Sequence, residues 1–158
     1  MKKYWPLVVI ILISALGGVS LLPLSKGVTS DHFMINMSGF FFLFLSTLKF
    51  WDLTGFYQNF AQYDLIAKKS SVYGYLYPFL ELVIAMGYLS HFFVIGVSLL
   101  TIALMLVTFC GVFIAVVTKK EIRCACMGSK LDLPLSVVSL VETLGMGTMA
   151  FFIFIHNL

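Results

Sequence analysis

The sequence predicts an all-α protein that crosses a membrane as a polytopic bundle of five helices. Hydrophobic residues make up 61% of its 158 residues, charged residues make up 11%, and the mean hydropathy is +1.04. About a quarter of the residues of a soluble domain are charged, so this chain has too few to cover a surface that faces water. A helix crosses the hydrocarbon core with about 20 apolar residues. The apolar runs near this length are Trp5–Leu24, Met37–Leu53, Val72–Leu89, Phe92–Thr118 and Pro134–His156.

The first apolar run has two interpretations. Lys2 and Lys3 precede it, and a charged start followed by an apolar run is also typical of a signal peptide, with a cleavage site near Gly17. The run continues to Leu24, beyond the apolar core of a usual signal peptide. We therefore expect a retained first helix; cleavage would leave a four-helix protein.

The segment from Thr54 to Lys69 differs from the apolar runs on either side. Aromatic and polar residues recur in it at helical spacing. This pattern favours an amphipathic helix in the membrane interface, where aromatic rings lie among the head groups. The alternative is a cytoplasmic extension of the second membrane helix. Asp64 lies in this segment close to Lys68, and we expect it to be a solvated interfacial charge.

Lysine and arginine residues predict the orientation of the bundle, because loops rich in them stay on the cytoplasmic side. We expect a multi-pass protein of the bacterial inner membrane with a cytoplasmic N-terminus. Because the basic residues are dispersed over loops, nucleic acid is not an expected partner. In this orientation the outer segments contain Lys26 alone, and the cytoplasmic segments contain Lys2, Lys3, Lys68, Lys69, Lys119, Lys120, Arg123 and Lys130, with Lys49 at a helix end.

Two cysteines, Cys124 and Cys126, lie in the polar loop between the last two apolar runs. Lys120 and Arg123 are close to them, and positive charge favours the reactive thiolate. The pair could cycle between dithiol and disulfide by exchange with a partner. It could instead bind a soft metal such as copper, zinc or mercury, with help from Met127, although a zinc site needs about four ligands. The third interpretation is a loop in which the cysteines are incidental.

Two carboxylates lie inside apolar runs, where an ionised side chain is costly. Glu81 and Glu142 are each about eight or nine residues from the cytoplasmic end of their run, or roughly 12–14 Å deep. Such groups face the interior of the bundle and are protonated or paired. Lys49 reaches the same end of the second run. We therefore predict a buried cluster of these three side chains, with a role either in packing or in proton handling.

The remaining candidate ligands form no site in the sequence. Cys110 lies inside the fourth run and is expected to pack as a small apolar side chain. His32, His91 and His156 are scattered over separate segments without the spacing of metal ligands. The residues themselves indicate no metal site and no fixed cofactor, and leave open a quinone or a soft metal.

Several motifs occur in the order in which they occur in the MauE family, named for methylamine utilisation and related to the DoxX-like membrane proteins. The chain resembles that family from about Met37 to its C-terminus. Its one mild departure is Met127, where the common family form has leucine. The motifs are Leu48–Asp52, Phe60–Leu65, Tyr75–Leu82, Cys124–Gly128, Leu133–Ser136 and Val141–Glu142.

The resemblance implies a redox-associated four-helix membrane domain over residues 37–158, preceded by an additional helix and outer loop over residues 1–36. In methylamine-utilising bacteria such a protein is needed for maturation of methylamine dehydrogenase, an exported enzyme rich in disulfides. The positions that carry over are Lys49, Asp52, Tyr63, Asp64, Tyr77, Pro78, Glu81, Cys124, Cys126, Gly128, Pro134 and Glu142.

The functional prediction is a thiol-redox or maturation role, with Cys124 and Cys126 as the exchanging pair. The expected partners are the lipid bilayer and a thiol-redox protein or an exported enzyme. One conflict remains within this prediction. The charge pattern places both thiols in the cytoplasm, whereas an exported partner is oxidised outside. Electrons could cross by way of a quinone; otherwise the loop takes electrons from a cytoplasmic thiol donor, or its role is metal handling. The alternatives are a small heavy-metal transport protein and a non-catalytic assembly partner.

Overall fold

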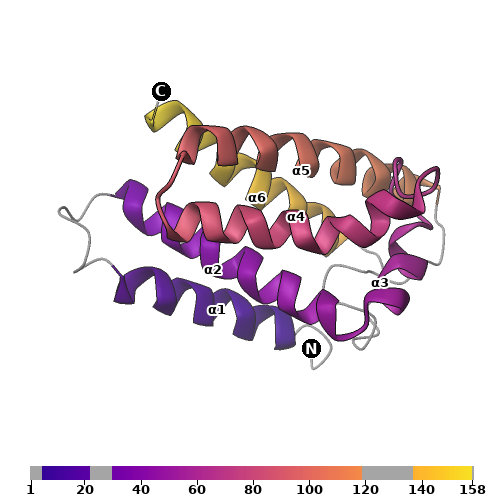
Figure 1. Ribbon diagram of the computed structural model, residues 1–158, viewed down its shortest axis with the longest axis horizontal. Coiled ribbons are helices and arrows are strands. Elements are labelled where there is room, and N and C mark those ends of the chain that lie inside the picture. Colours follow the sequence, from indigo (N-terminus) through magenta and orange to yellow (C-terminus); the bar gives the residue numbers. More distant parts are fainter. Residues whose placement is uncertain (1–4, 22–29, 119–136, 158) are drawn as a thin grey trace.

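The computed structural model describes residues 5–21, 30–118 and 137–157. These residues form helices and turns without a strand, which confirms the all-α prediction (Figure 1). The helices are α1 (Trp5–Ser20), α2 (Ser30–Trp51), α3 (Leu53–Phe60), α4 (Ser71–Leu89), α5 (Val94–Val117) and α6 (Val137–His156).

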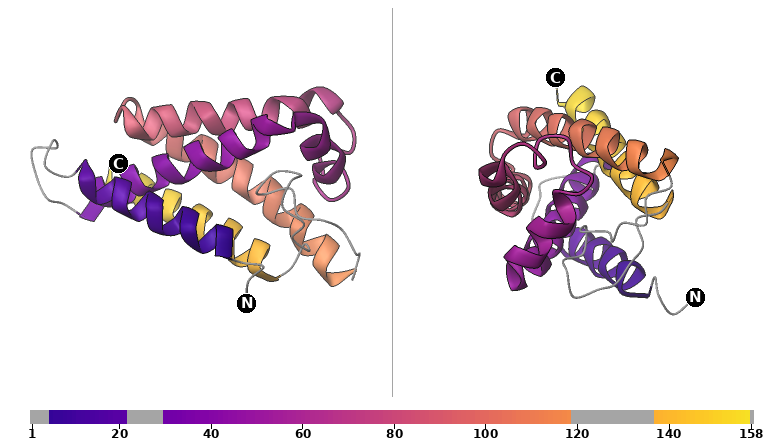
Figure 2. Two further views of the ribbon diagram at one scale, coloured as in Figure 1. Left: turned by 90° about the horizontal axis from the view of Figure 1, so that it is seen from below. Right: turned by 90° about the vertical axis from the view of Figure 1, so that its right-hand side faces the viewer.

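The five long helices lie along a common direction and alternate in polarity. α1 begins, and α2 and α5 end, at the same end of the bundle as the short α3 (Figure 1). The turn between α4 and α5 and the end of α6 lie at the opposite end. α2 packs against α4 and α1, and α5 packs against α6. α1 packs mainly on α2 and lies at the edge of the bundle (Figure 2).

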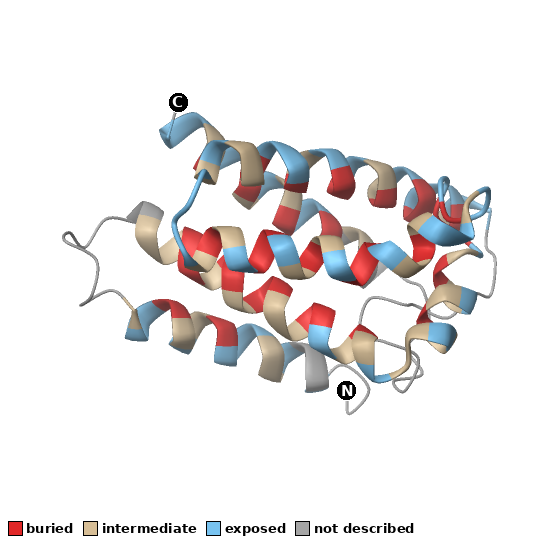
Figure 3. Cartoon of the chain, in the orientation of Figure 1, coloured by how far each residue is buried: buried red, intermediate tan, exposed pale blue. Residues whose placement is uncertain are grey.

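The outer faces of the bundle are apolar, as expected for a membrane protein. Three helical stretches are long and apolar enough to cross a bilayer, namely His32–Trp51, Ser71–Leu89 and Val94–Val117, and shorter apolar stretches occupy Val8–Ser20 and Thr143–His156. Exposed and buried residues alternate along each helix, so that one face points into the bundle and the other outward (Figure 3). Outward-facing side chains such as Phe79, Leu106 and Phe151 would be unusual in water and are suited to hydrocarbon.

The second helix begins earlier than the sequence predicted. α2 starts at Ser30 instead of Met37, so His32 and Asn36 are helical residues. Their polar side chains had suggested a loop. In the folded chain Asn36 is buried and bonds to His91 of the α4–α5 turn. A tertiary partner therefore allows polar residues to continue the helix.

The predicted amphipathic helix over 54–69 is wrong. Only its first part is helical, as α3, and the remainder folds into hydrogen-bonded turns, for example from the Asp64 amide to the Phe60 carbonyl at 3.0 Å. Asp52 caps α3 by accepting a hydrogen bond from the Gly55 amide at 3.0 Å. Phe56 and Phe60 are each 1% exposed, so the aromatic face packs into the bundle instead of lying in the interface.

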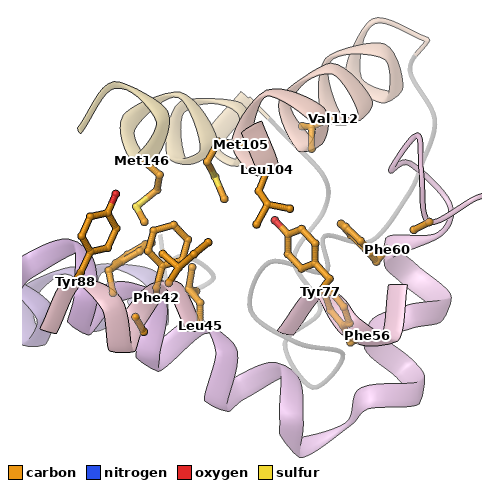
Figure 4. Close-up of a cluster of buried hydrophobic side chains, with 14 of the residues drawn as sticks. Phe42, Leu45, Phe56, Phe60, Tyr77, Tyr88, Leu104, Met105, Val112 and Met146 are labelled. Carbon is orange, nitrogen blue, oxygen red and sulfur yellow. The ribbon is translucent and has the colours of Figure 1, made fainter. Parts of the chain in front are cut away.

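The core contains a cluster of aromatic side chains from α3 and α4 (Figure 4). The rings of Phe56 and Phe60 are stacked with centroids 5.0 Å apart, and the Phe60 and Tyr77 centroids are 4.5 Å apart. These spacings are typical of favourable ring pairs. The cluster fixes the end of α3 against α4, directly beside the buried polar residues described next.

Candidate functional site

A buried ion pair joins α2 and α4. Lys49, in the last turn of α2, donates a hydrogen bond from Nζ to Oε1 of Glu81 in α4. The two side chains are 4% and 2% exposed. This is the pairing that the sequence predicted. Glu142 belongs to α6, but its side chain lies outside the described residues.

Aromatic rings surround the charged end of Lys49. Its Nζ lies 5.0 Å from the centre of the Tyr77 ring and 5.4 Å from that of Phe56. A cation over the face of an aromatic ring is stabilised by about 0.5–2 kcal/mol, with the larger values where water is excluded. α3 contributes Phe56 and so covers the ion pair at this end of the bundle.

A small cavity adjoins the ion pair. It encloses about 30 Å³, which is enough for one or two water-sized groups. The second oxygen of Glu81, Oε2, has no hydrogen-bond partner among the described residues. Tyr77 and Thr108 also line the cavity, and their hydroxyls are 3.1 Å apart. The walls also include Phe42, Leu45, Met105, Thr143 and Met146.

A buried ion pair such as this one adds little net stability to a bundle. Removing two charges from water costs several kcal/mol for each ion, and their attraction offsets this only with good geometry and further hydrogen bonds. Glu81 keeps one oxygen without such a bond among the described residues. Ionisable groups kept at such a cost inside a membrane bundle commonly handle protons or substrates. The arrangement can hold a proton on Glu81 and pass it to a group in the cavity.

Asp64 lies near this end of the bundle, and its predicted solvent exposure is wrong. The residue is 0% exposed. Its Oδ1 accepts hydrogen bonds from the amides of Ile66 at 3.0 Å and Ala67 at 2.9 Å, which fold the chain into a tight turn. Burial raises the pKa of Asp64, while these two bonds and the charge of Lys68 act in the opposite direction.

The turn that contains Asp64 contacts α5 through its backbone. A Cβ atom on Gly111 of α5 would lie 2.5 Å from the carbonyl oxygen of Tyr63 and 3.1 Å from Cα of Asp64. Only glycine allows so close an approach. This contact closes the end of the bundle over the aromatic cluster.

We expect Asp64→Asn to stabilise the protein near neutral pH. Asparagine is neutral, keeps an oxygen for the two amide donors and so mimics the protonated acid. Because burial raises the pKa of Asp64, protonation favours folding; this stability is complete below the unfolded pKa of 3.8 and is lost as the pH rises through the folded value. The gain should therefore shrink between about pH 7 and about pH 4. Thermal unfolding in detergent measures it, and an equal gain at both pH values would contradict the prediction.

The other predicted positions divide into three groups. Asp52 caps α3, and Tyr63 and Pro78 are buried where the aromatic cluster meets α4. Cys110 lies within α5, as expected, and its side chain is exposed on the outer face of that helix. Cys124, Cys126, Gly128 and Pro134 lie outside the described residues.

A histidine pair at the opposite end of the bundle was missed in the sequence. The rings of His32 and His91 have centroids 5.3 Å apart, and His91 Nε2 is 2.9 Å from Oδ1 of Asn36. Burial, followed by the neighbouring His32, lowers the pKa of His91. The two histidines come from α2 and from the α4–α5 turn, so no local spacing could have revealed them. Within the described ranges, no group of three or more His, Cys, Asp or Glu residues is placed to hold a metal ion.

The comparison with protein-family models connects these features. The model for methylamine utilisation protein MauE matches residues 32–156. The chain belongs to the MauE family. The match includes the Lys49–Glu81 pair, the Asp64 turn and both cysteines of the last loop, and it leaves α1 outside. Searches of curated proteins and of solved structures returned no match.

Proposed function

We propose that this MauE-family protein is a thiol-redox component of the bacterial inner membrane that supports maturation of an exported partner. Cys124 and Cys126 form the exchanging pair. In the exchange a thiolate of the reduced partner attacks the Cys124–Cys126 disulfide, a mixed disulfide forms, and the second thiol of the partner resolves it. The partner loses two electrons and two protons and becomes a disulfide, and the cysteine pair becomes a dithiol that an acceptor has to oxidise again.

The observation that carries this proposal is the buried Lys49–Glu81 pair beside a small cavity. When the cysteine pair passes its electrons to an acceptor within the membrane, protons have to follow them into the bundle, and a buried carboxylate can carry a proton there. Oε2 of Glu81 has no partner among the described residues and lines that cavity. A buried carboxylate of this kind is a functional-site candidate on physical grounds.

The course of the chain supports a connection between the two parts. α5 ends at the end of the bundle that contains α3, which is also the end at which α2 finishes (Figure 1), with Lys49 in the last turn of α2. The cysteine loop follows α5 directly in the sequence. The distribution of lysine and arginine favours a cytoplasmic location for this end. We therefore propose that the thiols exchange electrons on the cytoplasmic side.

Thiol trapping in whole cells tests the proposal. Cells are quenched with acid, and free thiols are labelled with a maleimide reagent that adds mass. We expect the Cys124–Cys126 pair to occur in both oxidised and reduced forms and to shift towards the reduced form after a permeant reductant. Cys110→Ser is the matched control and should leave this pattern unchanged. Labelling with permeant and impermeant reagents reports the side of the membrane.

The single variants Cys124→Ser and Cys126→Ser sharpen the test. One of them should accumulate a mixed disulfide with the partner, which non-reducing gels and mass spectrometry identify. Three results would overturn the proposal: a pair that stays reduced under all conditions, protection of both thiols by added copper or zinc, or full activity of the double cysteine variant.

A further inference from the structure

An apolar groove lies between α5 and α6 on the outer face of the bundle. It encloses about 410 Å³ and is lined by Ile102, Leu106, Phe109, Leu144, Gly147 and Phe151, among others. Leu106, Leu144 and Phe151 are each about half exposed, so in a membrane the groove opens to the hydrocarbon. Its volume is within the range of about 300–1,000 Å³ that is typical of small-molecule sites.

The groove is adjacent to the polar cavity of the Lys49–Glu81 pair. Met105 and Thr143 line both spaces. Met105 is 7% exposed and has the flexible side chain of methionine, which changes rotamer at little cost. The inner end of a molecule in the groove would therefore be separated from the cavity of the buried ion pair only by side chains that line both spaces.

The polar cavity limits what can reach the ion pair. At about 30 Å³ it admits one carbonyl or hydroxyl oxygen but no ring. Lys49 carries three N–H donors, one of which bonds to Glu81. Oε2 of Glu81 is an acceptor with no partner among the described residues. The cavity thus offers both a donor and an acceptor to a single oxygen atom.

We propose that the groove binds the ring of a membrane-soluble quinone, with one ring oxygen directed into the polar cavity. The oxidised ring presents a carbonyl that accepts from Lys49, and the reduced ring presents a hydroxyl that donates to Oε2 of Glu81. An acyl chain of a lipid fits the groove but uses neither group. A flat apolar ring with oxygens that change between acceptor and donor uses both.

This inference rests on the proposed function and identifies its electron acceptor by class. The dithiol of Cys124 and Cys126 is oxidised to a disulfide and loses two electrons and two protons. The quinone takes up both electrons and both protons and becomes a quinol. Glu81 holds and transfers one proton at the ring oxygen.

Binding to the purified full-length protein in detergent tests the site. The probe is decylubiquinone, measured by equilibrium dialysis. We expect Gly147→Leu to weaken binding at least about tenfold, because leucine fills the groove. An added Cβ at Gly147 meets its nearest neighbour, Met105 Cβ, at an ordinary 3.7 Å, so the helix should tolerate the change. Gly145→Leu is the matched control on the same helix, since a Cβ there meets nothing within 4 Å, and it should bind normally.

Competition separates a quinone from a lipid. Stearate at the same concentration should displace decylubiquinone less than unlabelled ubiquinone analogues do. Equal displacement by stearate would show an acyl-chain groove and would overturn the inference, as would equal affinity of the Gly147→Leu and Gly145→Leu proteins. The Cys124→Ser/Cys126→Ser protein should still bind the probe. If it binds but the cysteines never cycle in the cell, the proposed function fails; if the cysteines cycle but no quinone binds, this inference alone fails.

Discussion

Lys49→Met is expected to lower the free energy of unfolding by about 3–5 kcal/mol, the usual cost of breaking a buried ion pair. The loss is large because Glu81, 2% exposed, would remain in the bundle without its cation. The contacts of Nζ with the rings of Phe56 and Tyr77 would be lost as well. Unfolding in mixed detergent micelles measures the change. Lys69→Met is the matched control at an exposed lysine and should change stability little.

The double variant Lys49→Met/Glu81→Leu distinguishes a packing role from a proton-handling role. Replacing both members of a buried pair with apolar residues is often neutral or stabilising. We therefore expect the double variant to recover most of the stability that the single variant loses. If the pair handles protons, cysteine cycling should stay impaired in this stable protein. Recovery of both stability and cysteine cycling would show that the Lys49–Glu81 pair serves helix packing alone.

Gly111→Ala is expected to destabilise the protein by about 1–3 kcal/mol, the range for overpacked interiors. The new methyl group would lie 2.5 Å from the Tyr63 carbonyl oxygen, and a backbone atom cannot rotate away as a side chain can. The turn has to move, which would expose Asp64 and loosen the cover over the aromatic cluster. Hydrogen exchange of the amides of Ile66 and Ala67 should increase with the loss of stability.

Gly145→Ala is the control for this substitution. A Cβ at Gly145 meets nothing within 4 Å, and alanine favours a helix over glycine by about 1 kcal/mol. The control should therefore leave stability unchanged or raise it slightly. If Gly111→Ala and Gly145→Ala changed stability equally, α5 would not be in close contact with the Tyr63–Asp64 turn.

The membrane helices and the Lys49–Glu81 pair were predictable from the sequence because both follow from the cost of mismatched surroundings. Long apolar runs are unfavourable in water and are therefore expected to cross the membrane, and an ionised group inside such a run needs an opposite charge beside it. α2 and α4 are neighbours in the chain with opposite directions, so Lys49 and Glu81 could meet at the same end. The pattern of motifs also predicted the family, which the match over residues 32–156 confirms.

The surroundings of Asp64, Cys110 and the histidines were not predictable in this way. A short polar segment between membrane helices can adopt several local conformations, and its contacts with the rest of the bundle determine which one it adopts. Asp64 is buried because the carboxylate caps its own turn and Gly111 lets that turn approach α5. Cys110 points outward because its place on α5 turns it away from the neighbouring helices.

The sequence by itself determined that this chain is a helical membrane protein, where its long apolar runs lie, and that Lys49 and Glu81 would be buried together. These conclusions follow from composition and from the cost of placing a charge in hydrocarbon. Both can be read from short stretches of the sequence. Only the tertiary structure decided that α3 folds inward, that Asp64 is hidden, and that an apolar groove adjoins the polar cavity through Met105 and Thr143. These depend on contacts between segments far apart in the sequence, where packing and close backbone approach outweigh local propensity.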